Sequence, residues 1–170
     1  MKLQNGRWID IDRWDLIIAH PPCTYLTNAN TSGHSARVTP ENRIEGATIE
    51  RIHAMDFFMR CFQAPCEHVA VENPVGIMNT AFRRPDQIID PYMFADSEND
   101  KENYVTKRTC LWLRGLPCLK TNDLPKPDNA KLFGRRPTGK AATWEDVNHG
   151  SVARSKTFPG IAKAMAEQWG

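Results

Sequence analysis

The sequence predicts an α/β domain in which a mostly parallel sheet is flanked by helices. Two short apolar runs, "WDLIIAH" and "HVAVENP", have the continuous hydrophobicity of strands that are buried on both faces. Between them, residues 40–64 carry apolar side chains at spacings of three and four, which is typical of an amphipathic helix. A strand, a helix and a second strand in this order form a right-handed crossover with parallel strands.

The predicted helix over residues 40–64 has a beginning and an end in the sequence. Thr39 and Pro40 supply an N-cap and a first-turn proline, and Pro65 stops the pattern. The spacing places Ile52 among the side chains that face the core. This helix is therefore expected to cover one face of the sheet.

The rest of the chain predicts one more strand and one more helix. "TKRTCLWLRGL" is a third strand candidate, and "FPGIAKAMAEQW" is a short amphipathic helix at the end of the chain. Residues 117–148 mix Pro, Gly, Lys and Arg without periodicity, so they predict a long irregular segment. With 170 residues and no composition shift, residues 1–170 are expected to form a single domain.

Composition narrows the class of protein. No apolar run approaches the length of a membrane span and the first residues lack a signal segment, so we expect a cytoplasmic protein with no membrane association. Five cysteines without CxxC spacing argue against a disulfide framework and a zinc site, and no metal is expected.

The net charge of +2 is uneven along the chain, at −5 over residues 1–103 and +7 over residues 104–170. A basic C-terminal third suits either a nucleic acid or a solvated surface.

Cys23 and Glu72 are the candidate catalytic residues. Each follows or ends an apolar strand, in "DLIIAHPPCTYL" and "HVAVENP", and the ends of parallel strands share the edge where open α/β sheets bind ligands. Cys23 comes directly after two prolines that restrict the backbone, which suits a nucleophile as well as an inert thiol. His20 is either an activating base for Cys23 or a local hydrogen-bond partner.

Basic residues are candidates for contacts with phosphate or a base. Lys107 and Arg108 lie in or beside the third strand candidate, and Arg135 and Arg136 lie in the dense basic stretch "KLFGRRPTGK". Neither GxGxxG nor GxxxxGK[ST] occurs, so a nucleotide bound by those loops is not supported.

The ordered segments "DLIIAHPPCTYL", "AVENPVG", "TKRTCLWLRGLP" and "SKTFPGIAKAMAEQW" resemble the phage-type DNA methyltransferase-like proteins related to cytosine C5 DNA methyltransferases. In that family a Pro-Cys motif carries the nucleophile and a Glu-Asn motif carries a carboxylate. The resemblance implies that Cys23 adds to C6 of a flipped cytosine and that Glu72 contacts N3. The residues implied in substrate binding are Pro22, Asn73, Pro74, Lys107, Arg108, Arg135 and Arg136.

The resemblance also implies a truncated Rossmann-like (class I methyltransferase-like) fold and an S-adenosylmethionine-dependent DNA (cytosine-5) methyltransferase activity. The implied methyl donor is S-adenosylmethionine, but the family's glycine-containing loop that binds it is not found in this chain, so we expect the N-terminal cofactor half to be missing. DNA is the implied partner, in the host cytoplasm if a phage encodes the protein. The unpaired edge of "WDLIIAH" predicts a homodimer or a partner chain that completes the sheet.

Two other functions remain open from the sequence. One is a catalytically inactive methyltransferase-fold protein that binds nucleic acid, a nucleotide or a host defence protein. The other is a cysteine-dependent enzyme that acts on a free pyrimidine nucleotide, because addition at C6 activates that ring too.

Overall fold

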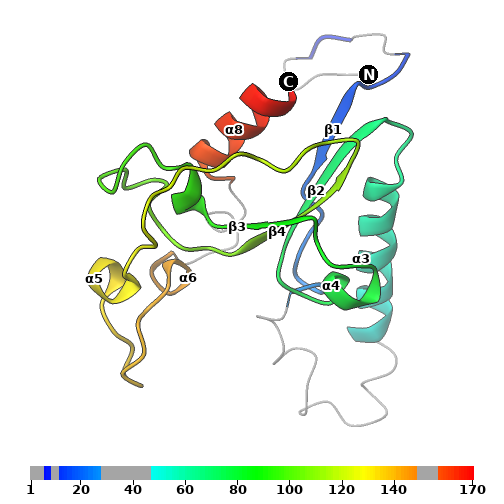
Figure 1. Ribbon diagram of the computed structural model, residues 1–170. Coiled ribbons are helices and arrows are strands. Elements are labelled where there is room, and N and C mark those ends of the chain that lie inside the picture. Colours follow the sequence, from blue (N-terminus) through cyan, green and yellow to red (C-terminus); the bar gives the residue numbers. More distant parts are fainter. Residues whose placement is uncertain (1–5, 9–11, 28–46, 149–156) are drawn as a thin grey trace.

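A computed structural model describes residues 6–8, 12–27, 47–148 and 157–170, which form an α/β fold around a four-stranded sheet (Figure 1). The strands are β1 (Leu16–Ala19), β2 (His68–Pro74), β3 (Gln87–Ile89) and β4 (Thr109–Arg114). They lie in the order β1-β2-β4-β3 across the sheet. The two strands of the predicted crossover and the predicted third strand, β4, are therefore confirmed.

The sheet is mixed, so the expectation of a mostly parallel sheet is not confirmed. β1 pairs with β2 in parallel, as the crossover predicts. β4 is antiparallel to both of its neighbours, β2 and β3. The reason is the connection from β3 to β4, which includes the 3-10 helix η2 (Pro91–Phe94) and returns at the same end of the sheet instead of crossing it. β3 consequently runs in the same direction as β1 and β2.

Helix α3 (Ala47–Phe62) covers one face of the sheet. Phe58 on this helix packs edge to face against Trp112 of β4, with the ring centroids 5.0 Å apart, and both rings are fully buried. The placement of Ile52 on the core side was wrong, because its side chain is 56% exposed. Residues 40–46 of the predicted helix lie outside the described residues.

The other face of the sheet packs against the C-terminal helix α8 (Pro159–Trp169) and η2. Ile161 and Met165 of α8 are buried in the same cluster as Leu111 and Leu113 of β4. The predicted terminal helix is thus confirmed, and its apolar face meets the sheet as the periodicity indicates.

Residues 124–148, here called the arm, lie beside the sheet and contain helices α5 (Asn129–Phe133) and α6 (Trp144–Val147) (Figure 1). These helices are too short to produce a periodic pattern, which is why the sequence indicated an irregular segment. Local capping forms them instead: the Asp128 side chain accepts a hydrogen bond of 2.9 Å from the backbone N–H of Ala130. The arm packs through Trp144 against the residue before α8, with the ring centroids of Trp144 and Phe158 5.2 Å apart.

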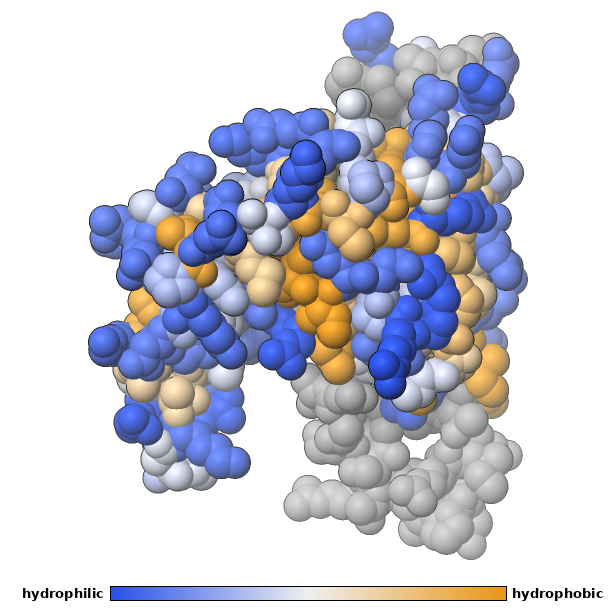
Figure 2. All heavy atoms as spheres, in the orientation of Figure 1, coloured by the Kyte–Doolittle hydropathy of each residue, from blue (hydrophilic) through white to orange (hydrophobic). Residues whose placement is uncertain are grey.

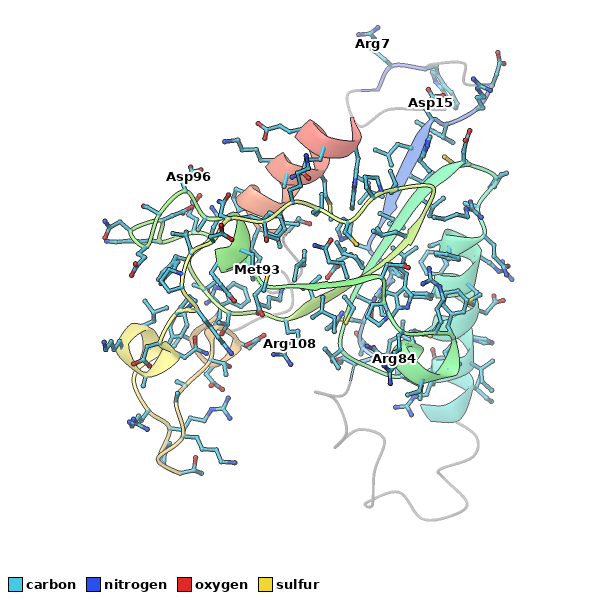
Figure 3. The ribbon with its side chains drawn as sticks, viewed as in Figure 1. Arg7, Asp15, Arg84, Met93, Asp96 and Arg108 are labelled. Carbon is cyan, nitrogen blue, oxygen red and sulfur yellow. The ribbon has the colours of Figure 1, made fainter. Side chains whose placement is uncertain are left out.

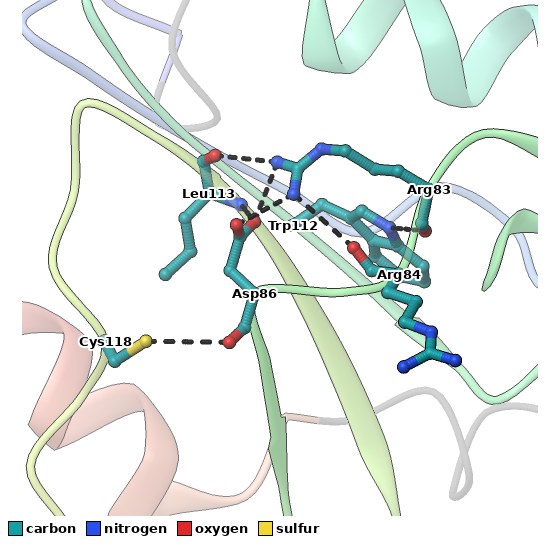
Figure 4. A network of polar contacts seen from close by, with 6 residues as sticks. All are labelled: Arg83, Arg84, Asp86, Trp112, Leu113 and Cys118. Atoms are coloured by element: carbon teal, nitrogen blue, oxygen red, sulfur yellow. Dashed lines mark hydrogen bonds and ion pairs between the residues drawn. The ribbon is translucent and has the colours of Figure 1, made fainter.

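A polar network ties the segment between α4 (Met78–Ala81) and β3 to strand β4 (Figure 4). Arg83 donates two hydrogen bonds of 2.8 Å to the two carboxylate oxygens of Asp86 and one of 3.0 Å to the carbonyl of Leu113. Asp86 accepts a further bond of 2.6 Å from the backbone N–H of Leu113, and the indole N–H of Trp112 donates to the Arg83 carbonyl at 2.9 Å. This network fixes the short strand β3 against β4.

β1 lies at one edge of the sheet within the described residues. The prediction that its segment is buried on both faces was wrong, since Ile18 is 36% and Trp14 46% exposed. An exposed strand edge is a place where another chain can pair, and a homodimer or partner chain there stays a prediction. No helix in the described parts of the chain is long and apolar enough to cross a membrane.

Candidate functional site

Three strands that run in the same direction end in a polar residue followed by proline. Residues 20–21, 73–74 and 90–91, which read His-Pro, Asn-Pro and Asp-Pro, end or follow β1, β2 and β3. β4 begins at this end too, because Thr109 pairs with Pro74 and with Ile89. We call this end of the sheet the polar edge. It is the end at which open α/β sheets hold their ligands.

Cys23 lies in a tight loop at the polar edge. The chain leaves β1 through Pro21, which is buried, and reaches Pro22 and Cys23, which are exposed. The carbonyl of Cys23 accepts hydrogen bonds of 2.9 Å from the backbone N–H groups of both Leu26 and Thr27, so the loop turns immediately after the cysteine. The thiol is therefore exposed on an ordered backbone, as a nucleophile requires.

The second half of the loop is fixed to the residues that follow β2. The backbone N–H of Ile77 donates to the carbonyl of Leu26 at 2.8 Å, and Thr27 forms an isolated bridge with Gly76. A Cβ atom on Gly76 would lie 1.9 Å from the Leu26 carbonyl oxygen. Glycine is required at this position because only its lack of a side chain lets the two backbones approach.

Glu72 and Asn73 hold the other side of the same loop. Nδ1 of His20 lies 3.0 Å from Oε2 of Glu72, and Nδ2 of Asn73 donates to the carbonyl of Pro21 at 2.8 Å. Successive residues of a strand point to opposite faces. Glu72 and Asn73 therefore hold the loop from opposite faces of the sheet. Glu72 keeps a 24% exposed side chain, whereas Asn73 is buried.

Asn73 is a positioning residue in this geometry. Its side chain is 1% exposed, its amide nitrogen is used by Pro21, and within the described residues its Oδ1 has no hydrogen-bond partner. A role for Asn73 in contacting substrate, and likewise for Pro22 and Pro74, stays a prediction. Pro22 lies beside Cys23 and Pro74 ends β2, so both are at the polar edge.

Arg108 brings a positive charge to the polar edge. It is exposed and directly precedes β4, and its side chain points away from the sheet (Figure 3). Its charge acts on two buried groups there. Burial raises the pKa of the Cys110 thiol and that of the Asp90 carboxyl, and the Arg108 guanidinium opposes both shifts. The carboxylate of Glu72 adds to the rise at Cys110, so Glu72 and Arg108 act on the same sulfur.

Lys107 is engaged inside the protein. Its Nζ lies over the rings of Trp144 and Phe158, 5.0 and 5.4 Å from their centroids. This cation–π arrangement attaches the arm to the segment just before β4, next to Arg108. The sequence indicates Lys107 and Arg108 as neighbouring candidates. In the structure Lys107 lies over two aromatic rings, whereas Arg108 is exposed.

Arg135 and Arg136 lie on the arm and not beside Cys23. Arg136 is held by Asp146, with Nε 2.7 Å from Oδ2, and Arg135 donates to the carbonyl of Gly139 at 2.8 Å. Both side chains are exposed. Their predicted contact with DNA, which stays a prediction, would therefore be made by the arm.

Sequence reasoning missed Asp90 and the partner of His20. Asp90 follows an apolar pair and precedes a proline, the same pattern as at His20, and Asn73 shares the proline that follows, so this repeated pattern was the available signal. The contact of His20 with Glu72 had no local signal because 52 residues separate them.

The described residues contain no group of three His, Cys, Asp or Glu side chains that could hold a metal ion. The described groups at the polar edge include an exposed thiol, a carboxylate paired with an imidazole, and a guanidinium. Comparison with models of protein families, with curated proteins and with solved structures finds no match for this chain.

Proposed function

We propose that this chain carries out the base-activating part of a DNA cytosine C5 methyltransferase reaction. Cys23 is the nucleophile and Glu72 the residue that binds N3 of the cytosine. The observation that carries the proposal is the pair of contacts, His20 with Glu72 and Asn73 with Pro21, that attach the Cys23 loop to the strand end bearing Glu72. The shared direction of β1, β2 and β3 supports a Rossmann-like fold as part of the proposal.

The reaction begins with a flipped cytosine at the polar edge. The thiolate of Cys23 adds to C6, the electron pair of the C5–C6 double bond moves toward C5 and N3, and the Glu72 carboxyl supplies a proton to N3. C5 is then nucleophilic and takes a proton from water. The original C5 proton then passes to the hydroxide that this water left, the N3 proton returns to Glu72, and the thiolate departs, which regenerates cytosine with a solvent hydrogen at C5.

His20 orients the carboxyl group for this task. It lies at Oε2 of Glu72, so in this proposal Oε1 is the atom that faces N3. A fixed carboxyl contributes to catalysis because its orientation is set before the substrate binds.

The described residues do not fit a cradle for S-adenosylmethionine. Gly76 is the described glycine at the polar edge, and its backbone is already covered, since even a Cβ there would meet the carbonyl of Leu26. The described glycines with positive φ lie before β1, after β4 and on the arm, at Gly6, Gly115, Gly134 and Gly139. We therefore assign no step of the proposed reaction to the methyl donor.

The test uses exchange of the hydrogen at C5, because it needs no methyl donor. DNA that contains cytosine tritiated at C5 is incubated with the protein, and release of tritium to water is measured. We expect release by the native chain and a loss of at least about 100-fold in Cys23→Ser and in Glu72→Gln. A matched Cys118→Ser variant, which removes another exposed thiol, should keep the native rate.

Two results would contradict the proposal. One is equal release by the native chain and by Cys23→Ser. The other is no release by a native chain that is shown to be folded and bound to the DNA, which would favour a binding protein without catalysis. Release from free deoxycytidine monophosphate, but not from DNA, would favour an enzyme of free nucleotides.

A further inference from the structure

The tip of the arm, residues 131–140, is the densest basic surface in the described chain. Lys131, Arg135, Arg136 and Lys140 lie in these ten residues with no acidic residue among them. All four side chains are exposed. Figure 2 shows a mainly hydrophilic surface over the arm and a hollow between the arm and the rest of the molecule.

The tip is an ordered turn. Arg136 and Gly139 close it, with the N–H of Gly139 donating to the Arg136 carbonyl at 2.8 Å, and the N–H of Arg136 donates to Lys140 at the same distance. The bridge between Arg135 and Ala141 continues the pairing. Three backbone contacts hold the tip in place, so its cations are presented without the ordering cost of a free loop.

Arg136 of the tip is paired with an acidic side chain, and Arg135 contacts the turn through its hydrogen bond to the Gly139 carbonyl. Arg136 is held by Asp146 and lies within 3.4 Å of the Thr143 hydroxyl. In the described part of the chain, Lys131, Arg135 and Lys140 have no acidic partner. Their charges are spread over α5 and the turn, an arrangement that matches successive phosphates better than a single one.

The arm is attached close to the candidate site. Thr106 donates to Oδ1 of Asn129 at 3.0 Å, and Lys107 lies over the Trp144 ring, so the base of the arm is fixed to the two residues that precede Arg108. Arg108 itself is exposed and points away from the sheet (Figure 3).

We infer that Lys131, Arg135 and Lys140 form a binding surface for the phosphodiester backbone of a polynucleotide, which holds the strand while one base enters the polar edge. The identity of that base rests on the proposed function. The surface itself does not, because phosphate contacts need no chemistry at Cys23. With both parts together, the substrate is a cytosine within a polynucleotide and not a free nucleotide.

The test measures binding of labelled single-stranded and duplex DNA to a Cys23→Ser chain by fluorescence anisotropy, at salt concentrations from about 50 to 200 mM. In the triple variant K131Q/R135Q/K140Q we expect binding at least about 10-fold weaker and a salt dependence reduced by roughly two to three released ions. The two DNA forms share this chemistry, and comparing them shows which one the surface prefers.

Two control variants separate the surface from the total charge. K101Q/K120Q/K163Q removes the same number of charges from exposed positions outside the arm and should bind within about twofold of the native chain. K131R/R135K/K140R keeps the charges and should also bind within about twofold. Circular dichroism of each variant checks that the fold is intact.

Three outcomes would overturn the inference. They are native binding and native salt dependence in K131Q/R135Q/K140Q, an equal loss in K101Q/K120Q/K163Q, and displacement of the DNA by deoxycytidine monophosphate at equal phosphate concentration. Because the binding chain lacks the Cys23 thiol, failure here is distinct from failure of the exchange assay. Exchange without tip-dependent binding contradicts this inference alone, and tip-dependent binding without exchange contradicts the proposed function alone.

Discussion

Nδ1 of His20 lies 3.0 Å from Oε2 of Glu72, although 52 residues separate them in the chain. The contact joins the residue that follows β1 to the end of β2. Both side chains are partly exposed, at 39% and 24%, so the pair contributes little to stability compared with a buried one. Its consequence is geometric, since it sets the direction of the carboxyl group beside the Cys23 loop.

Replacing either member of this pair should affect catalysis far more than folding. His20→Gln and Glu72→Gln are each expected to lower the free energy of unfolding by at most about 1 kcal/mol, because the pair is exposed to solvent. Glu72→Gln should lower tritium exchange at least about 100-fold, and His20→Gln by a smaller factor, because His20 only orients the carboxyl. Urea unfolding and exchange rates measured on the same preparations check this. A His20→Gln rate below that of Glu72→Gln would assign His20 a direct role.

Asn73 should control how tightly the Cys23 loop is held. Asn73→Ala removes the 2.8 Å bond to the Pro21 carbonyl inside the protein, and we expect a loss of about 1–3 kcal/mol in the free energy of unfolding. Loosening should also raise the rate at which a thiol reagent modifies Cys23. The rate is measured in a Cys118→Ser background, which removes the other exposed thiol. Asn122→Ala, which removes a bond from an asparagine Nδ2 to the Ala95 carbonyl outside the Cys23 loop, is the matched control. An unchanged labelling rate would show that the bond does not restrain the loop.

Much of this architecture follows from local patterns, and the rest depends on contacts that no local pattern records. The apolar runs and helical spacing predict β1, α3 and β2, and the positions of Cys23 and Glu72 follow from where the strands stop. The direction of β4 could not be predicted, because a strand buried on both faces has the same composition whether it is parallel or antiparallel. The helical spacing also placed Ile52 inward, but α3 turns that side chain to the exposed face.

The contacts that hold the Cys23 loop in place could not be predicted from the sequence either. His20, Asn73 and Gly76 each act through a partner about 50 residues away in the chain. A single sequence does not identify such partners. A proline at or just after the ends of β1, β2 and β3 was the feature that the sequence does show. It locates the polar edge but does not identify the contacts there.

Gly76 should tolerate no side chain. In Gly76→Ala the new Cβ would meet the Leu26 carbonyl, so the loop must move away from β2, and we expect a loss of about 3 kcal/mol or more in the free energy of unfolding. The matched control is Gly134→Ala, where φ is +76° but nothing lies within 4 Å of the new atom. That variant should lose only about 1–2 kcal/mol, from backbone strain alone. Chemical denaturation measures both, and equal losses would mean that the contact with Leu26 is not limiting.

Asp86 should make the stability of the protein depend on acid. Burial raises the pKa of this carboxyl, but hydrogen bonds from Arg83 and from the Leu113 N–H outweigh it and hold the pKa below its ordinary value. The folded state therefore binds fewer protons than the unfolded state in this range. The stabilisation is present above the unfolded pKa and is lost as the pH falls through the folded pKa, beginning below about pH 5.

Asp86→Asn should remove this part of the acid dependence. We expect its free energy of unfolding to be lower at neutral pH, by on the order of 1 kcal/mol because the pair is partly exposed, and to fall less steeply than that of the native chain below about pH 5. Some slope should remain, because hydrogen bonds that outweigh burial also lower the pKa of Asp100 and Asp146. Urea unfolding across the acid range measures both curves. Parallel curves for the two proteins would mean that Asp86 binds its proton equally well in the folded and unfolded states.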